Sequence, residues 1–107
     1  MLSKNNRVTK DVFQRIMKEG LFLSGSIFTF RYIYQKSLSC AFVAPKSLSK
    51  KAVTRNKLRR QGYSALRSVP SNLLMPLACI FFYKKQVKDA SFEDIKKDVS
   101  TILSKVK

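Results

Sequence analysis

The residues that most clearly indicate a chemical role in this sequence are the cations clustered between positions 46 and 67. Eight lysines and arginines lie in this stretch, which contains none of the chain's six acidic residues. On a helix, like charges three or four residues apart repel each other by about 0.2–0.5 kcal/mol per pair, and no local acid offsets this repulsion. A polyanion would offset this repulsion, and the planar guanidinium group of arginine suits bidentate contacts with phosphate. The eight cations are Lys46, Lys50, Lys51, Arg55, Lys57, Arg59, Arg60 and Arg67.

The usual catalytic groups are missing from the sequence. There is no histidine, so the common general base near neutral pH and the imidazole metal ligand are both absent. Asp94 and Asp98 lie four residues apart on a predicted helix, and we interpret them as surface charges that complement the helix dipole. Cys40 and Cys79 lie in apolar runs and are interpreted as buried thiols, without a disulfide or a metal. We therefore expect no catalytic residue and no metal site, so that any reaction is carried out by a partner.

The overall composition indicates a basic folded domain with a polyanionic partner. The 107 residues include 22 lysines and arginines, for a net charge of +16, and 45% of them are hydrophobic. That apolar content is too high for a disordered tail, and the length suits one domain over residues 1–107. Nucleic acid and an anionic membrane surface both fit the charge, and the arginines favour nucleic acid. Because no signal peptide is visible and the apolar stretch 73–83 is about half a membrane span, we expect a cytoplasmic protein.

Two amphipathic helices are predicted near the two ends of the chain. The first covers residues 9–19, with Thr9 as the N-cap and Gly20 as the end. The second begins at Ser91, which forms a capping-box pattern with Asp94, and it continues to residue 106. Its apolar stripe consists of Phe92, Ile95, Val99, Ile102, Leu103 and Val106.

The strands are predicted from runs of β-branched and aromatic residues. Residues 27–34 and 38–44 are joined by three residues, a spacing typical of a hairpin, so we expect an antiparallel pair. Alternation sends Phe28, Phe30 and Tyr32 to one face of the first strand, and Thr29, Arg31 and Ile33 to the other. Neither face is wholly polar, so both are expected to be covered. The apolar residues 76–83 predict a strand of the same sheet that is buried on both faces.

The cationic stretch itself is predicted to be a helix between the second strand and the last one. Ser47 or Ser49 can cap it, and it runs to about Ser68, before Pro70. The residues expected on its inner side are Leu58, Gly62, Ala65 and Val69, and those expected on its outer side are Asn56, Lys57, Arg60 and Arg67.

An extended motif runs through this basic helix. Ala44-Pro-Lys46 is followed, after a short spacer, by Lys51-Ala-Val-Thr-Arg55-Asn-Lys-Leu-Arg-Arg60. This resembles the signature of the bacterial ribonuclease P protein, which carries Lys-Ala-Val, one variable residue, the RNR motif Arg-Asn-Arg, an apolar residue and a basic pair. The resemblance includes Arg7-Val8, the first helix, the strands and the closing helix, and thus covers nearly the whole chain.

The resemblance implies an α+β fold, a single-domain α-β sandwich in the order helix, strands, helix, strand, helix. It also implies a left-handed βαβ crossover, as in folds that are ribosomal protein S5 domain 2-like. General rules of handedness favour the opposite crossover, so this detail comes from the resemblance alone.

The resemblance also implies a function, that of the protein subunit of a ribonucleoprotein that cuts precursor tRNA endonucleolytically at its mature 5′ end. Catalysis is expected to reside in the RNA subunit, which binds most of the Mg²⁺, and the protein assists substrate and metal-ion binding. The expected partners are ribonuclease P RNA and precursor tRNA, with no membrane and no required protein partner. The residues implied to contact the catalytic RNA are Lys46, Lys51, Arg55, Asn56, Lys57, Arg59 and Arg60.

A cleft between the first helix and the sheet is implied to hold the single-stranded 5′ leader of precursor tRNA, with aromatic rings stacking on its bases. Phe13 matches the family's cleft best, and Met17, Thr29 and Arg31 line the cleft by position. Phe13 and Met17 also fit an ordinary core stripe, and that alternative stays open at this stage.

The sequence departs from the family pattern at three places in the basic segment. Lys57 replaces the second arginine of the motif and loses its planar fork, and Ser47 replaces a common lysine. Gly62 weakens the middle of the helix by about 1 kcal/mol relative to alanine, or it lets the helix approach the sheet closely. Two other functions remain as alternatives, a structural RNA-binding protein such as a small ribosomal protein and a basic protein lying on an anionic membrane.

Overall fold

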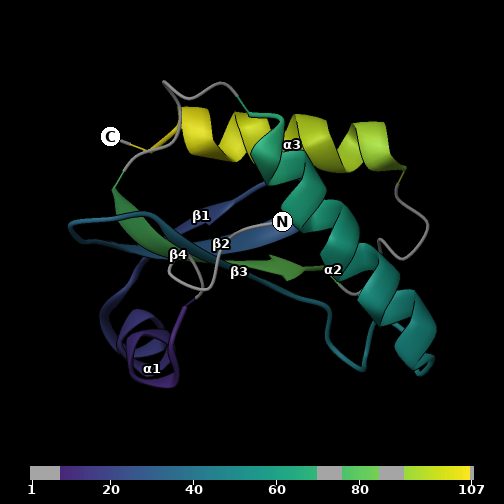
Figure 1. The fold of residues 1–107 in the computed structure, drawn as a ribbon, viewed down its shortest axis with the longest axis horizontal. Coiled ribbons are helices and arrows are strands. Elements are labelled where there is room, and N and C mark those ends of the chain that lie inside the picture. The colour runs from purple at the N-terminus through teal and green to yellow at the C-terminus, as the bar shows by residue number, and fades with distance from the viewer. Residues whose placement is uncertain (1–7, 70–75, 85–90, 107) are drawn as a thin grey trace.

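The computed structural model describes residues 8–69, 76–84 and 91–106, which form a four-stranded sheet with helices on both faces. In Figure 1 the sheet lies between α1 on one side and α2 with α3 on the other. No helix of the described part is long and apolar enough to cross a membrane. The elements are α1 (Lys10–Glu19), β1 (Leu21–Ser24), β2 (Phe28–Tyr34), β3 (Ser39–Val43), α2 (Ala52–Arg67), β4 (Leu77–Tyr83) and α3 (Phe92–Ser104).

The order of strands in the sheet is β1-β2-β4-β3, so the predicted hairpin between β2 and β3 is wrong. The chain between them crosses over the position of β4, which pairs antiparallel with β2 and parallel with β3. The physical reason is the apolar content of β4, because a strand buried on both faces is most stable in the centre of a sheet, with both edges hydrogen-bonded. The parallel pairing makes β3-α2-β4 a βαβ unit, as expected, and the handedness of its crossover stays a prediction.

The first strand, β1, is absent from the predictions. Its four residues pair antiparallel with β2 at the edge of the sheet, from Leu21 opposite Tyr32 to Ser24 opposite Thr29. Leu21 and Phe22 are both exposed, so the strand lacks the alternation of buried and exposed residues that would have indicated it.

Helix α1 covers one face of the sheet and has the predicted ends. The Thr9 hydroxyl accepts a hydrogen bond from the Val12 N–H, and the Gly20 N–H donates to the Ile16 carbonyl. Ile16 is completely buried in a small core with Ile33, Ala78 and Ile80 of the sheet. The helix therefore lies over β2 and β4, and the expectation that both faces of β2 are covered is confirmed.

The larger core lies on the opposite face, under α2 and α3. The rings of Phe28, Phe30, Phe42 and Phe81 pack there in edge-to-face, tilted and stacked pairs. The apolar stripe of α3 closes this core from above, with Ile95, Val99, Ile102 and Leu103 fully or almost fully buried. The Ser91 hydroxyl accepts from the Asp94 N–H, which confirms the predicted cap.

Asp98 is buried, so its interpretation as a surface charge is wrong. One carboxylate oxygen accepts the N–H of Ser26, and the other accepts those of Ile27 and Phe28, at 2.9–3.0 Å. Gly25 lies so close to this carboxylate that a Cβ there would be 2.6 Å from both oxygens. Asp98 therefore joins the C-terminal helix to the turn between β1 and β2, because buried backbone donors need acceptors.

The two cysteines are buried thiols, as predicted. They face each other across the β3–β4 pairing, with 3.0 Å between the sulfur atoms of Cys40 and Cys79. Burial, followed by the hydrogen bond between the two thiols, raises the pKa of Cys79 well above its ordinary value. The thiols thus serve as small apolar core groups.

Candidate nucleic-acid interface

Helix α2 is fixed to the molecule along its inner side. Leu58, Ala65 and Leu66 are buried, and the Tyr83 hydroxyl of β4 donates a 2.6 Å hydrogen bond to the Leu58 carbonyl. Burial raises the pKa of this tyrosine, which therefore stays a neutral donor. Gly62 lies against the Phe42 ring so closely that a Cβ at this position would overlap it. The absence of a side chain at Gly62 thus lets α2 approach the sheet, one of the two roles expected for it.

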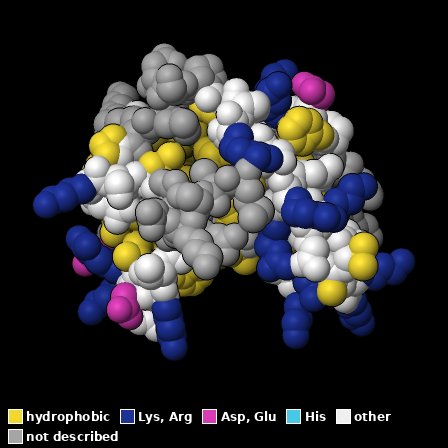
Figure 2. Space-filling view, in the orientation of Figure 1, with side chains coloured by type: hydrophobic (Ala, Val, Ile, Leu, Met, Phe, Trp, Pro, Cys, Tyr) yellow, Lys and Arg dark blue, Asp and Glu magenta, His cyan; other side chains and the backbone are white. Residues whose placement is uncertain are grey.

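The outer side of α2 carries cations that have no ionic partner among the described residues. Lys57, Arg60 and Arg67 are exposed, as is Asn56, and so are Lys46, Lys50 and Lys51 in the approach to the helix. Within the part of the chain that the structure describes, the one ion pair joins Arg15 to Glu19 on α1. Figure 2 shows dark blue side chains gathered over α2 with little magenta among them. We call this surface, made by Asn56, Lys57, Arg60 and Arg67 with the preceding lysines, the basic face of α2.

The predicted RNA contacts of the motif differ in how their side chains are held. Arg55 is half-buried, and its Nη1 donates a 2.8 Å hydrogen bond to the Ser49 carbonyl in the loop that leads into α2. Arg59 donates from Nη2 to the Asn56 side-chain oxygen on the same helix. Lys57 and Arg60 have no such attachment among the described residues. Arg55 therefore orders the approach to the helix, and Lys57 and Arg60 project freely.

The start of α2 differs from the prediction. The helix begins at Ala52 after Lys51, without a side-chain cap, whereas Ser47 or Ser49 was expected to cap it. The Ser49 hydroxyl instead accepts the Lys51 N–H within the loop. The first turn contains no acidic residue, so the positive end of the helix dipole adds to the charge of the neighbouring lysines.

On the opposite face of the sheet, Phe13 and Thr29 both lie beside Phe82, near the N-terminal half of α1. The Phe13 ring packs edge-to-face with Phe82 of β4, with 6.3 Å between centroids. Phe82 is opposite Thr29 in one strand pairing and opposite Val43 in the other, and all four side chains are half-buried. The sequence predictions did not include Phe82 and Val43, although alternation along their strands places them on this face.

The other two predicted cleft residues, Met17 and Arg31, meet at the C-terminal end of α1. Arg31 Nη1 donates a 3.4 Å hydrogen bond to the Met17 carbonyl, and the Met17 side chain is 40% exposed. The guanidinium carbon of Arg31 is 5.7 Å from the ring centre of Phe22 on β1. The four predicted residues thus form two groups on one surface, which we call the α1 face, with Phe13 and Thr29 in one group and Met17 and Arg31 in the other.

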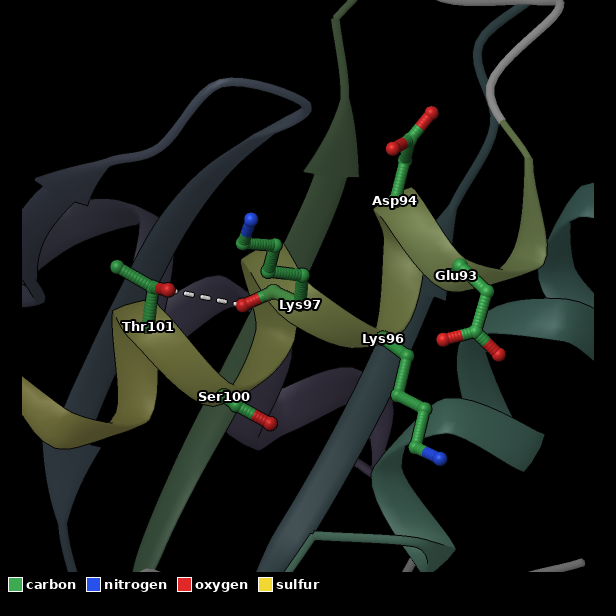
Figure 3. A pocket seen from close by; sticks show the side chains of 6 residues that line it. All are labelled: Glu93, Asp94, Lys96, Lys97, Ser100 and Thr101. Carbon is green, nitrogen blue, oxygen red and sulfur yellow. Dashed lines mark hydrogen bonds between the residues drawn. The ribbon is translucent and has the colours of Figure 1, made fainter.

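A surface hollow on α3 has a different character. It is lined by charges of both signs and two hydroxyls, with the Thr101 hydroxyl donating to the Lys97 carbonyl of its own helix (Figure 3). No aromatic side chain lines it for stacking, and its acids oppose phosphate. The lining residues are Glu93, Asp94, Lys96, Lys97, Ser100 and Thr101. Among the described residues, those of this hollow included, no group of three or more Asp, Glu, Cys or His side chains is placed to hold a metal ion.

The fold, the basic face of α2 and the α1 face together define a class of protein. It is the class of small α+β RNA-binding proteins with a basic helix on one side of a mixed sheet. The family model described as Ribonuclease P matches residues 2–107, and the chain belongs to this family. It is accordingly the protein subunit of the ribonuclease P ribonucleoprotein endonuclease, which processes the 5′ ends of tRNA. The predicted family and function are thereby confirmed.

Solved structures of bacterial ribonuclease P proteins share this fold. A Staphylococcus aureus RNase P protein mutant, described as having defective mRNA degradation activity, matches with a TM-score of 0.82 and 24% identity over 94% of this chain and 87% of that chain. The RNase P protein from Thermotoga maritima matches with a TM-score of 0.81 and 19% identity, over 94% and 96%. These matches confirm the predicted α+β fold. No curated protein sequence gives a significant match.

Proposed function

We propose that the basic face of α2 is the surface with which this subunit binds ribonuclease P RNA. The observation that carries the proposal is a row of exposed cations without a single carboxylate partner among the described residues, on a helix fixed from behind. Each phosphate contact from such a cation releases counterions, and this release supplies affinity. The RNA-contacting residues are Lys46, Lys51, Asn56, Lys57, Arg59 and Arg60, and Arg55 contributes partly by ordering the loop at Ser49.

We propose that the α1 face receives the single-stranded 5′ leader of precursor tRNA. Its half-buried rings and its cation offer stacking and phosphate contacts on the same surface, which is the combination that single strands require. Phe13 and Thr29 contact the leader at one end of α1, and Met17 and Arg31 contact it at the other. In this proposal Phe13 serves both purposes that its sequence position left open, and the packing of its partly exposed ring on Phe82 supports this.

The hydrolytic chemistry in this proposal belongs to the RNA subunit. Mg²⁺ held mainly by that RNA would supply the activated water and stabilise the leaving group. The protein binds the RNA through α2 and orients the leader on the α1 face, with no protein group in the cleavage step. We expect the particle to work in the cytoplasm and to need no other protein.

The test is cleavage of precursor tRNA by a cognate ribonuclease P RNA at low Mg²⁺, with and without this protein. Strong stimulation by the protein, and no cleavage by the protein alone, is the expected result. RNA binding without stimulation would contradict the proposal and indicate a purely structural role. Binding to anionic vesicles without binding to RNA would indicate a membrane role instead.

A further inference from the structure

Phe22 is an exposed ring at the free edge of the sheet. Its side chain is 56% exposed, and it lies on β1, the edge strand, directly opposite Arg31 of β2. Leu21, the preceding residue, is 52% exposed but belongs to the opposite face, because successive side chains of a strand alternate. The two neighbours thus give the sheet edge an exposed apolar group on each face. Phe22 is the one on the face that α1 covers.

Arg31 connects this ring to α1. Its guanidinium carbon is 5.7 Å from the centre of the Phe22 ring, and its Nη1 donates to the Met17 carbonyl near the end of the helix. No carboxylate of the described residues forms an ion pair with it. A guanidinium has five N–H donors, so most of them remain open for a ligand after the bond to Met17.

We propose that Phe22 and Arg31 form a stacking site for one nucleobase of the precursor tRNA leader, beyond the site at Phe13. This inference rests on the proposed function of the α1 face. The base lies on the exposed ring, and the guanidinium contacts the adjoining phosphate. A single-stranded nucleic acid supplies both groups at once, whereas an apolar protein partner would bury this cation without a counter-charge.

The position of the pair extends the leader path across the sheet. Phe82, which packs on Phe13, is on β4, and Phe22 is two strands away on β1, about 10 Å across the sheet. A strand of RNA that leaves the group of Phe13 and Thr29 therefore passes Arg31 of β2 before it reaches the sheet edge. The inference predicts that leader nucleotides beyond those at the Phe13 group contribute to affinity in this protein.

The experiment measures the affinity of the reconstituted ribonucleoprotein for precursor tRNA carrying a long leader, a leader shortened from its 5′ end, or no leader. The leader contains one fluorescent adenine analogue, scanned through its positions, whose emission is quenched by stacking. Phe22→Ala is expected to weaken binding of the long-leader precursor by about five- to tenfold and to abolish quenching at the one position that stacks on Phe22. Affinity for the leaderless tRNA is expected to stay unchanged.

Two matched variants make the result specific. Leu21→Ala removes a similarly exposed apolar group from the opposite face and should leave every affinity unchanged. Phe22→Tyr keeps the ring plane and should bind the long leader like the wild type, whereas Phe22→Leu keeps apolar bulk without the plane and should bind like Phe22→Ala.

Several outcomes would overturn the inference. If Phe22→Ala binds the long leader like the wild type, while the wild-type protein still stimulates cleavage, the stacking site is refuted and the proposed function stands. Wild-type affinity of Phe22→Leu would replace stacking by simple apolar contact. If Phe22→Ala converts a dimer to a monomer in sedimentation without affecting the leader, the ring belongs to a protein interface. A wild-type protein that fails to stimulate cleavage would refute the proposed function, and the inference with it.

Discussion

The basic face of α2 and the α1 face are built on opposite sides of one sheet from different chemical groups. The first consists of exposed cations on a helix whose inner side is fixed by Leu58 and Gly62. The second consists of half-buried side chains around Phe13 and one cation, Arg31, held by backbone and ring contacts. Contacts of the first kind depend strongly on salt and little on base identity, whereas stacking requires unpaired bases. In the proposed function, one small domain thus separates affinity for a folded RNA from recognition of a single strand.

Asp98→Ala is the substitution expected to have the largest effect on the free energy of unfolding. It leaves three backbone N–H groups of the β1–β2 turn without their acceptor, two of them in buried residues, and each such loss costs about 1–3 kcal/mol. We expect the free energy of unfolding, measured by urea denaturation, to fall by about 3 kcal/mol. Asp94→Ala, at an exposed position in the first turn of α3, is the control and should cost less than about 1 kcal/mol. Equal losses would mean that Asp98 does not hold the turn.

Gly62→Ala tests how α2 is held against the sheet. In the middle of an unconstrained helix, this change would stabilise the protein by about 1 kcal/mol. Here the added methyl group overlaps the Phe42 ring, which is stacked on Phe81 in the core, so a loss of about 1–3 kcal/mol in the free energy of unfolding is expected. Gln61→Ala, one residue away, is the control and should have little effect. A stabilised Gly62→Ala variant would show that α2 does not depend on this close approach.

Phe13→Ala should separate the two regions functionally. We expect it to weaken binding of leader-bearing precursor tRNA by about tenfold, because stacking contributes about 1–3 kcal/mol per base. Binding of leaderless tRNA, and of ribonuclease P RNA alone, should be nearly unchanged. Both affinities are measured on a variant whose folding is first verified by circular dichroism. Equal losses for both substrates would return Phe13 to a purely structural role.

Arg60→Ala is expected to give the smallest change, seen in the salt dependence of RNA binding. Loss of one phosphate contact should reduce the slope of log affinity against log salt by about 0.7–0.9. Arg15→Ala is the matched control, because Arg15 is paired with Glu19 on α1 and lies outside the basic face. An unchanged slope for Arg60→Ala, or an equal change in both variants, would mean that the basic face does not contact phosphate.

Local signals in the sequence predicted the helices well. Thr9, Gly20 and Ser91 are caps that act through neighbouring backbone groups, so their effect is readable from a few adjacent residues. The inner and outer sides of α2 follow from helical periodicity, which placed Leu58 and Ala65 inward and Arg60 outward. Two of these local predictions were wrong, since neither Ser47 nor Ser49 caps α2 and the helix begins only at Ala52.

Features that depend on contacts between distant segments could not be predicted from the sequence. The sheet order required knowing that β4 enters between β2 and β3, a choice decided by burial of the whole strand and not by the short link between its neighbours. Asp98 looked like other surface acids because its three donors are about 70 residues away. The candidate site shows the same limit, since the Phe13–Phe82 and Phe22–Arg31 pairs join residues from different elements.

The central position of β4 affects how the protein folds while it is being synthesised on the ribosome. Synthesis proceeds from the N-terminus, so β2, β3 and the basic helix leave the exit tunnel before the strand that joins them. Until residue 83 emerges, Phe28 and Phe42 lack the shared neighbour that buries them, and pairings of this long range form slowly. The nascent chain therefore exposes its cations before it has a stable fold, and the sheet that supports the basic helix is completed only after β4 has emerged.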